Sequence, residues 1–458
     1  MKKVVVQGLG FVGLAMSTAI ASAKNNKGDS IYEVIGLELP NKDGIKKVSC
    51  INSGLLPVST TDNLLKESFN NCVEKGNLSA STNPQVLSNA DYVIVDINLD
   101  VNNKDGENYI NFNGFQKAIS TVGEFIPKDA LVIIETTVPP GTTEKIVYPI
   151  LHEKLKSRFS ELTTPLLAHS YERVMPGPNY FNSITNFWRV FSGCNNESAS
   201  KCREFLETII NTEKYKMVEL KKTSASETAK IMENSFRSLN IAFIDEWSKF
   251  AEIIGVDLFE IINAIRLRPT HKNIMEPGLG VGGYCLTKDP LMGLISLEQI
   301  YDQKLEFPLS KLSVKINKEM PENTLKLIKE NLSCDEKERI LVLGLTYRED
   351  VGDLRFSPSE DLISALVKES LNIDCHDPMV GKTNCNGAKF LKRLPNAEKY
   401  SMIILTVKHS KFKEIDYEKW LKNFKGIIID SNHVLKTSQV VRLSSLGIKI
   451  KAIGRGDL

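Results

Sequence analysis

The chain has 458 residues, of which 42% are hydrophobic and 25% are charged, as in an ordinary globular protein. This length exceeds what one core usually supports, so we expect roughly two to four domains. The 58 basic and 56 acidic residues leave a net charge of +2, which gives no electrostatic reason to expect a nucleic-acid partner. A phosphorylated small molecule stays compatible, because it needs only a local cluster of Lys and Arg.

Cysteine usage argues against disulfides and against metal ligation. No two cysteines form a Cys-x-x-Cys pair, and a chain of this size does not need disulfide staples. We therefore expect reduced thiols, a cytoplasmic location and no bound metal. The eight cysteines stand at positions 50, 72, 194, 202, 285, 334, 375 and 385.

The first residues imitate a signal peptide. A basic pair at 2–3 precedes an apolar run, and residues 21–23 resemble a cleavage site. Gln7 and three glycines interrupt the run, and no uninterrupted apolar stretch long enough to cross a bilayer follows. We therefore expect neither a spanning helix nor a membrane partner.

The first third of the chain alternates short β-branched runs with helical stretches. This alternation predicts a parallel sheet with helices on both faces. Residues 11–23 are expected to form the first helix. Strands are expected at 3–6, 34–38, 92–95 and 131–134, and polar loops at 25–30 and 102–108.

The middle of the chain is helical in pattern from 224 to about 265. Apolar residues recur near the helical period, and the helix can break near Gly255. Ser224, with Glu227 three residues later, predicts a capping box at its start. The apolar stripe favours a homodimer interface, with packing in the protein's own core as the alternative.

The last third returns to alternation and predicts a second doubly wound domain that begins near Pro321. Strands are expected at 339–343, 403–405 and 427–429, and a helix at 359–368. The expected fold is therefore α/β, with two Rossmann-like domains joined by a central helical domain that contains a long helix. The expected domain ranges are 1–212, 213–318 and 319–458.

A glycine-rich turn lies between the first expected strand and the first expected helix. Gly8 allows a tight turn, Gly10 lets the backbone approach a pyrophosphate, and Gly13 lets the helix pack closely on the strand. The helix N-terminus would then face the phosphates with its partial positive charge. The expected dinucleotide-binding residues of this turn are Gly8, Gly10, Phe11, Val12 and Gly13.

Glu38 ends the second expected strand, where an acidic residue typically binds the ribose hydroxyls. It lies somewhat beyond the usual offset, and the polar loop at 25–30 absorbs the extra length. A carboxylate at this point repels a 2′-phosphate, which favours NAD over NADP. The alternative is an exposed glutamate at a strand end that binds no ligand.

The most informative segment is a glycine-rich loop at 277–283 that is followed by Cys285, Lys288 and Asp289. Clustered glycines allow the backbone to approach a ligand closely. A cysteine near a lysine can be a stabilised thiolate nucleophile, and the carboxylate can transfer protons. The alternative for a lone cysteine is a small buried hydrophobic residue.

Further candidate residues accompany this loop. Lys230 and Asn234 are four residues apart, which places them on one helix face, with an ordinary solvated face as the alternative. A Thr-rich turn at 136–142 follows a β-rich run. Arg348 and Arg355 follow a strand and can bind phosphates bidentately, with surface ion pairs to neighbouring aspartates as the alternative.

In this order, the blocks resemble the family of UDP-glucose, UDP-N-acetylhexosamine and GDP-mannose dehydrogenases, from Lys3 to at least Val434. The resemblance implies an NAD-binding Rossmann domain, a central helical dimerisation region and a C-terminal nucleotide-sugar domain. It also implies the NAD-dependent four-electron oxidation of a sugar at C6, through a thioester on Cys285, by a homodimer.

The resemblance implies a role for each matching residue. The catalytic residues would be Cys285 as nucleophile, Lys230 and Asn234 around the oxyanion, Asp289 as acid/base, Thr137 beside the catalytic water, and Glu172. Besides the glycine-rich turn and Glu38, the cofactor would contact Thr137, Lys288 and Arg355. The substrate would contact Glu172, Arg173, Lys230, Asn234, Arg237, Gly282 and Arg348, and Arg268 would reach the substrate of a neighbouring subunit.

Three positions depart from the family pattern. Residues 96–100 replace a stretch that usually contains Thr-Pro, Tyr171 replaces the Pro before the active-site Glu, and Thr287 replaces the Pro before Lys-Asp. UDP-glucose enzymes tend to have a second Glu where this chain has Pro176. The segment 172–177 therefore favours UDP-N-acetylglucosamine or UDP-N-acetylmannosamine, which the sequence does not separate, and UDP-glucose stays an alternative.

Two other functions fit part of the pattern. A single-step hydroxyacid dehydrogenase of the 6-phosphogluconate type shares the N-terminal fold and a Lys and Asn on a helix. It would need neither Cys285 nor a second α/β domain. A nucleotide-sugar or NAD sensor without turnover would keep the fold, but the joint presence of Cys285, Lys230, Asn234 and Asp289 argues against it.

Overall fold

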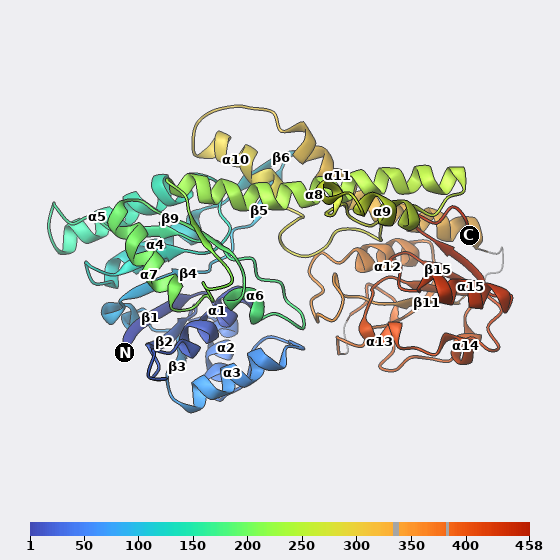
Figure 1. Cartoon of the computed structure of the whole chain (residues 1–458), viewed down its shortest axis with the longest axis horizontal. Coiled ribbons are helices and arrows are strands. Elements are labelled where there is room, and N and C mark those ends of the chain that lie inside the picture. The colour runs from blue at the N-terminus through green and yellow to red at the C-terminus, as the bar shows by residue number, and fades with distance from the viewer. Residues whose placement is uncertain (333–338, 382–383) are drawn as a thin grey trace. The chain divides into compact units, whose positions relative to one another are not determined.

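The computed structural model describes residues 1–332, 339–381 and 384–458, which form two compact units (Figure 1). Unit 1 comprises Met1–Glu233 and Leu291–Phe307, and unit 2 comprises Asn234–Pro290 and Pro308–Leu458. The expected division into three domains stays a prediction. Cys334 lies outside the described residues, and the seven cysteines within them form no disulfide.

Unit 1 is built on an eight-stranded sheet in the order β10-β9-β8-β7-β4-β1-β2-β3. Six neighbouring strands of this sheet are parallel, namely β8, β7, β4, β1, β2 and β3, and β9 runs antiparallel to β8. The four strands expected in this region are confirmed. The strands are β1 (Lys2–Gln7), β2 (Tyr32–Leu37), β3 (Leu78–Ser81), β4 (Tyr92–Val95), β7 (Leu131–Ile134), β8 (Leu166–His169), β9 (Arg189–Gly193) and β10 (Met217–Glu219).

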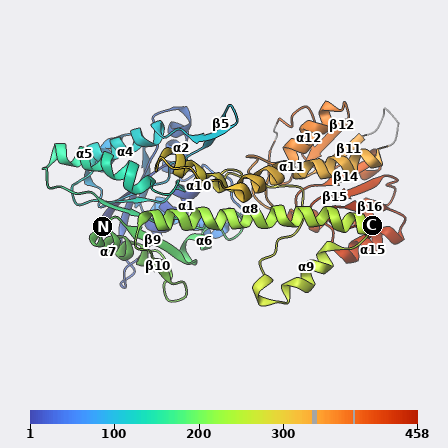
Figure 2. The same ribbon diagram turned by 90° about the horizontal axis from the view of Figure 1, so that it is seen from above.

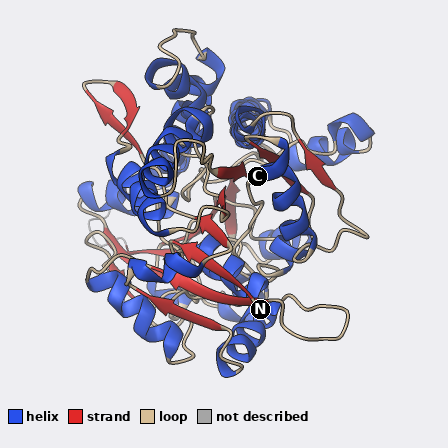
Figure 3. Cartoon of the chain, turned by 90° about the vertical axis from the view of Figure 1, so that its left-hand side faces the viewer, coloured by secondary structure: helices blue, strands red, loops and turns tan. Residues whose placement is uncertain are grey.

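Helices cover both faces of this sheet (Figure 3). On one face, Val4 and Val6 of β1 pack with Leu14, Phe69 and Phe205, which come from three different helices. Burial of such side chains is the main stabilising term of the sheet–helix layers. The helices of unit 1 are α1 (Phe11–Ser22), α2 (Lys42–Asn52), α3 (Asn63–Glu74), α4 (Asn113–Phe125), α5 (Tyr148–Arg158), α6 (Asn182–Thr185), α7 (Asn196–Glu207) and α10 (Met292–Gln299), with turns η1 (Pro84–Asn89) and η2 (Thr143–Val147).

The loop expected at 102–108 is instead a β-hairpin, so that expectation was wrong. Strands β5 (Val101–Lys104) and β6 (Glu107–Ile110) pair antiparallel. Asp105 and Gly106 both have positive φ, at 54° and 88°. Two consecutive positive-φ residues match the tight turns that suit the twist of a two-residue hairpin, and Asp-Gly is a preferred sequence for them.

The long helix expected from residue 224 is α8 (Thr223–Ile254), a single continuous helix (Figure 2). The break near Gly255 is confirmed, since Gly255 has a φ of +79° and α9 (Leu258–Arg266) follows it. The expected capping box was wrong. Helix α8 already begins at Thr223, and the Glu227 carboxylate binds Gly141 and Thr143.

Unit 2 contains a parallel six-stranded sheet in the order β13-β12-β11-β14-β15-β16. Alternate residues of the central strand β11 enter opposite cores: Ile340 packs on the side of α11 and α12, and Leu341 on the other side with Phe412. A second doubly wound sheet is thus confirmed. Its strands are β11 (Arg339–Leu343), β12 (Asn372–His376), β13 (Lys389–Phe390), β14 (Met402–Leu405), β15 (Ile427–Asp430) and β16 (Lys449–Ala452).

The remaining helices of unit 2 include α11, which passes through the position where the second domain was expected to begin. Pro321 lies inside this helix and is buried. It packs against the glycine-rich loop, because a Cβ on Gly280 would lie 3.4 Å from Pro321 Cδ. The helices are α11 (Pro308–Asn331), α12 (Pro358–Lys368), α13 (Ser410–Lys413), α14 (Tyr417–Trp420) and α15 (Thr437–Ser445), with turns η3 (Pro269–His271), η4 (Asp289–Leu291) and η5 (Ala397–Lys399). No helix of the described chain has the length and apolarity needed to cross a bilayer.

Candidate active site

The glycine-rich turn joins β1 to α1 at the carboxyl edge of the unit 1 sheet. Gly8 has a φ of +97°, and a Cβ there would lie 2.6 Å from the Asp96 carbonyl oxygen. A Cβ on Gly13 would lie 1.9 Å from the Gly8 carbonyl oxygen, so only glycine fits there. These contacts agree with the tight turn and the close helix packing of a dinucleotide-binding loop.

Gly10 differs from the other two glycines, because a Cβ on it would meet no protein atom within 4 Å. A larger side chain at this position would therefore not collide with the protein itself. Glycine is required here because a pyrophosphate must approach the backbone closely. Gly10 is also the N-cap of α1 and gives the first turn no side-chain hydrogen bond. This helix end suits a phosphate, and Phe11 and Val12 follow directly in its first turn. The Tyr180 hydroxyl donates to the Phe11 carbonyl, a support that the sequence did not reveal.

Glu38 follows β2, as expected for a residue that binds ribose. Its Oε1 accepts hydrogen bonds from Leu9 N at 2.8 Å and from Lys47 Nζ at 2.7 Å. The first bond ties the carboxylate to the glycine-rich turn. Because Glu38 is held beside this turn, the site fits NAD, whose ribose hydroxyls a carboxylate can bind.

The turn that carries Thr137 follows β7 and is held by α8. Gly141 N and Thr143 N donate to the two oxygens of Glu227, at 2.5 and 2.8 Å, and Thr143 Oγ1 lies 2.6 Å from Oε1. Burial raises the pKa of Glu227 to about 8, although these hydrogen bonds oppose the shift. Glu227 thus links the Thr137 turn to the helix that carries Lys230.

Lys230 and Glu172 meet within unit 1, as expected. Lys230 Nζ donates to the Glu172 carbonyl oxygen at 2.7 Å and lies 3.6 Å from its Oε1. The Lys230 side chain is only 10% exposed, which rules out the ordinary solvated face that was its alternative. A largely buried ammonium group held in this way is suited to stabilise a developing oxyanion.

A buried acidic pair lies beside the glycine-rich turn, where the sequence departs from the family pattern. Asp96 and Glu135 follow the adjacent strands β4 and β7, and Arg189 Nη2 binds Glu135 Oε1 at 2.8 Å. Burial and the neighbouring Glu135 carboxylate hold the pKa of Asp96 well above its usual range. A Cβ on Gly13 would lie 3.2 Å from Asp96 Oδ2, so this carboxyl group packs directly against the glycine-rich turn.

In unit 2, the glycine-rich loop before Cys285 packs tightly on Tyr347. A Cβ on Gly282 would lie 2.6 Å from Tyr347 Cβ, and one on Gly283 would lie 2.6 Å from Tyr347 Cε2. Gly283 N also donates to the Arg355 carbonyl oxygen at 3.0 Å. Packing thus accounts for Gly282, whose expected substrate contact stays a prediction. Cys285 at the end of this loop is exposed, which excludes a buried hydrophobic role.

Asp289 lies one turn after Cys285 and is fully buried. Its N–H donates to the Cys285 carbonyl oxygen at 2.9 Å, which fixes the spacing of the two residues along the chain. Lys288 Nζ binds Asp289 Oδ1 at 2.8 Å, and Asn234 Nδ2 donates to Oδ2 at 2.7 Å. Unit 2 therefore joins four of the expected site residues in one connected group.

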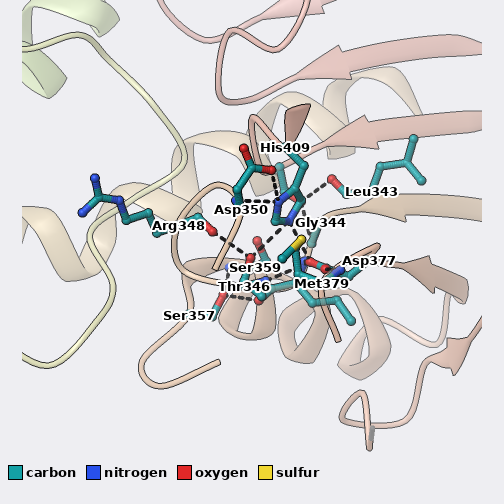
Figure 4. A network of polar contacts seen from close by, with 12 residues as sticks. Leu343, Gly344, Thr346, Arg348, Asp350, Ser357, Ser359, Asp377, Met379 and His409 are labelled. Carbon is teal, nitrogen blue, oxygen red and sulfur yellow. Dashed lines mark hydrogen bonds and ion pairs between the residues drawn. The ribbon is translucent and has the colours of Figure 1, made fainter. Parts of the chain in front are cut away.

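The two arginines after β11 have different environments. Arg355 forms a bidentate ion pair with Asp353, with Nη2 2.7 Å from Oδ2, and this pair raises the pKa of Arg355. Arg355 therefore has the local ion pair that was its alternative, and its expected contact with the cofactor stays a prediction. The Arg348 guanidinium makes no hydrogen bond or ion pair with the described residues, and Figure 4 shows it extending away from the polar network behind it.

That network holds the Arg348 loop around His409, which is fully buried (Figure 4). Asp350 N donates to His409 Nδ1 at 2.9 Å, so Nε2 carries the proton toward Asp377 Oδ2, 3.1 Å away. Thr346 N also donates to Asp377, and Thr346 Oγ1 donates to the Arg348 carbonyl oxygen at 2.9 Å. The sequence did not reveal His409 and Asp377, because they follow β14 and β12 and are distant in sequence from the arginine motif.

Several expected residues lie outside these groups. Arg173 is engaged by Glu233, Tyr171 and the Trp188 carbonyl oxygen. Arg237 on α8 and Arg268 after α9 are exposed. Their expected substrate contacts stay predictions. The part of the chain that the structure describes contains no group of three or more His, Cys, Asp or Glu residues suited to a metal.

Comparison with known proteins gives three matches along the chain. Residues 2–211 match the NAD binding domain of the UDP-glucose/GDP-mannose dehydrogenase family, residues 224–319 its central domain, and residues 341–437 its UDP binding domain. Together the three models cover most of the chain, in the order that the sequence motifs predicted.

Individual relatives match over all or nearly all of their length. A UDP-N-acetyl-D-mannosamine dehydrogenase of Pyrococcus horikoshii is 30% identical, with 100% of each chain covered. One from Methanocaldococcus jannaschii is 29% identical over 99% of this chain and 97% of the relative. The solved structure of the UDP-D-ManNAc dehydrogenase from P. horikoshii matches with a TM-score of 0.81 at 29% identity, covering 100% of both chains. The NDP-N-acetyl-D-galactosaminuronic acid dehydrogenase of Methanosarcina mazei matches at 0.79 and 25% identity, over 100% of this chain and 96% of that one.

Proposed function

Because the chain belongs to the UDP-glucose/GDP-mannose dehydrogenase family, we propose that it oxidises C6 of a nucleotide sugar to a carboxylate through a thioester on Cys285. NAD is the cofactor, in keeping with the NAD binding domain at 2–211. The observation that carries the mechanism is the exposed Cys285 thiol, one turn before a buried Asp289 that binds Lys288 and Asn234.

The reaction removes four electrons from the substrate, and NAD supplies the oxidising power by accepting one hydride in each of two rounds. In the first round the hydroxyl proton leaves to a base and C6 becomes an aldehyde. The Cys285 thiolate adds to this aldehyde, which gives a thiohemiacetal and keeps the aldehyde from escaping. After the second oxidation, water hydrolyses the thioester, which frees the carboxylate and restores the thiol.

The other residues act on charge, protons and water. Lys230 and Asn234 are one turn apart on α8, and both can donate to an oxygen anion on C6. Asp289 exchanges protons with the reacting groups, and Thr137 positions the hydrolytic water. Glu172 holds Lys230 in its functional orientation.

For the substrate, we propose a UDP-N-acetylhexosamine, with UDP-N-acetylmannosamine favoured. Relatives that match over the whole chain carry that activity in their names. Pro176, where UDP-glucose enzymes tend to have a second Glu, supports the N-acetylhexosamine class. The guanidinium of Arg348, which extends away from the polar network of its loop, is the cation expected to bind the diphosphate (Figure 4).

We also propose that the enzyme is a homodimer that uses the apolar face of α8. Phe243, Trp247 and Phe250 follow the helical period and are 52%, 44% and 50% exposed. Large aromatic side chains exposed in a row on one helix are typical of a protein–protein interface. A second copy of the same helix offers a matching surface. The described cysteines form no disulfide, which agrees with a reducing compartment, the cytoplasm.

The test is NADH formation with UDP-N-acetylmannosamine, UDP-N-acetylglucosamine, UDP-glucose and GDP-mannose. We expect turnover with the first, and a uronic acid product identified by mass spectrometry. Preference for UDP-glucose or GDP-mannose would overturn the substrate assignment. Tight binding of nucleotide sugars without any NADH would instead support a sensor.

A further inference from the structure

The segment that carries Glu172 is fastened to α8 by the side chains of Tyr171, Arg173 and Glu233, of which only Arg173 was expected to contact the substrate. Tyr171 Oη donates to Glu233 Oε1 at 2.9 Å, and Arg173 Nη2 donates to Tyr171 Oη at 3.1 Å. Arg173 also pairs with Glu233 through Nε, 3.0 Å from Oε2, and through Nη2. The three side chains therefore form a closed triangle of hydrogen bonds. All of them belong to unit 1.

The three side chains of this triangle lie next to Glu172 and Lys230, two residues of the proposed mechanism. Tyr171 and Arg173 flank Glu172 in the chain, and Glu233 lies three residues after Lys230, on a neighbouring position of α8. Lys230 Nζ lies 5.5 Å from the centroid of the Tyr171 ring and binds the Glu172 carbonyl oxygen at 2.7 Å. Any movement of the Tyr171 ring would therefore change the surroundings of the Lys230 ammonium group.

The charges favour this arrangement. Burial and the nearby Glu233 carboxylate raise the pKa of Tyr171, so its hydroxyl stays protonated and donates. Hydrogen bonds from Arg173 lower the pKa of Glu233 despite its partial burial, so it stays ionised and accepts. Arg173 also donates from Nη1 to the Trp188 carbonyl oxygen at 2.6 Å. Since its donors are engaged in this way, Arg173 is better suited to hold the segment than to bind substrate.

We propose that Tyr171, Arg173 and Glu233 form a positioning clamp that holds Glu172 and Lys230 in register for catalysis. The assignment rests on the proposed function, because it deepens the role of that site. It also gives a physical reason for Tyr171, which stands where the family pattern has Pro. The hydroxyl fastens the segment to α8 by a hydrogen bond that a proline ring cannot form.

The test compares Tyr171→Phe and Glu233→Gln with Tyr32→Phe, which removes a buried hydroxyl that lies 3.0 Å from Thr208 Oγ1, far along the chain from this segment. Loss of hydrogen bonds to a charged group should lower kcat about tenfold in both clamp variants. The KM for NAD should change less than about twofold, because the glycine-rich turn is untouched. The double variant should lose little more than either single variant, since the two residues act as one unit. Tyr32→Phe should keep the wild-type kcat.

A second readout does not depend on turnover. Hydrogen exchange at the amides of 170–176 should be faster in Tyr171→Phe and Glu233→Gln than in wild type or Tyr32→Phe. The Glu233 side chain is 41% exposed, so its substitution should not prevent folding. Wild-type kcat together with wild-type exchange in both clamp variants would overturn the clamp. A wild-type protein inactive on every nucleotide sugar, but with faster exchange in the clamp variants, would instead refute the proposed function alone.

Discussion

Asn234 Nδ2 donates a 2.7 Å hydrogen bond to Asp289 Oδ2, and Asp289 is fully buried. The other oxygen of Asp289 binds Lys288 at 2.8 Å, so the carboxylate is fixed from both sides. Asn234 was expected to stabilise an oxyanion and Asp289 to exchange protons. Because the two side chains are in direct contact, any change to the Asp289 carboxylate would alter the hydrogen bond that the Asn234 amide donates.

Asp289→Asn should lower kcat by about 100-fold or more, because the carboxylate that exchanges protons is lost. It should also lower the melting temperature, since Lys288 loses its buried ion-pair partner. The matched control is Asp245→Asn, which alters an Asn–Asp pair of similar geometry, with Asn323 Nδ2 2.8 Å from Asp245 Oδ1. The control should affect stability but leave kcat unchanged. Equal kcat values in the two variants would remove Asp289 from the mechanism.

Glu38→Ala should raise the KM for NAD about tenfold and leave kcat nearly unchanged, because the ribose contact acts equally in the ground and transition states. Lys47 loses its 2.7 Å partner in this variant and becomes available to a 2′-phosphate. Discrimination against NADP should therefore weaken. Steady-state kinetics with both cofactors measure this. Glu33→Ala, on the exposed part of the same strand, is the control, and an unchanged KM for NAD in Glu38→Ala would refute the ribose role.

Glu227 makes stability depend on pH. Its carboxyl group has a pKa of about 8 in the folded chain, against an ordinary value of 4.5. Between these values the folded state binds more protons than the unfolded state, so the free energy of unfolding falls as pH rises, by at most ~1.4 kcal/mol per pH unit. Outside this window Glu227 contributes no slope.

The measurement is the melting temperature of wild type and Glu227→Gln from pH 5 to pH 9. The difference between the two should shift in favour of the variant as pH rises to about 8 and then stay level. A constant difference across the whole range would show that the carboxyl group ionises normally despite its burial.

If α8 forms the proposed homodimer interface, replacing Trp247 and Phe250 with Lys should yield a monomer, because the charges oppose burial of this helix face. Light scattering coupled to gel filtration gives the mass directly. Phe159→Lys, at an exposed aromatic residue after α5, is the control and should leave the mass unchanged. If the double variant has the same dimeric mass as wild type, this face of α8 is not the interface.

The sequence predicted the framework well, because each element carries its own local signal. The β-branched runs of β1 and β11 and the glycines that follow β1 are short-range patterns, and the structure has them where they were expected. The hairpin at 101–110 was missed even though Asp105-Gly106 is a good turn signal. The second doubly wound domain was predicted to begin near Pro321, but helix α11 continues through this residue.

The site was predicted only in part, for a physical reason. Motifs identify residues that touch ligands, but the side chains that hold them come from distant parts of the chain. Glu233 binds Tyr171 across 62 residues, and His409 binds Thr346 across 63. Such contacts depend on the tertiary fold and leave no local pattern. Glu227 shows the same limit, since its spacing suggested a capping box and its carboxylate instead holds the Thr137 turn.

In the proposed mechanism, the exposed sulfur of Cys285 carries the substrate as a thioester that the second oxidation forms and water hydrolyses. The most direct measurement mixes enzyme, NAD and nucleotide sugar, quenches within the first turnover, and determines by mass spectrometry which residue carries added mass. We expect an acyl adduct on Cys285, two NADH per uronic acid formed, and no adduct in Cys285→Ser. One NADH per substrate, or full conversion to acid by Cys285→Ser, would contradict it.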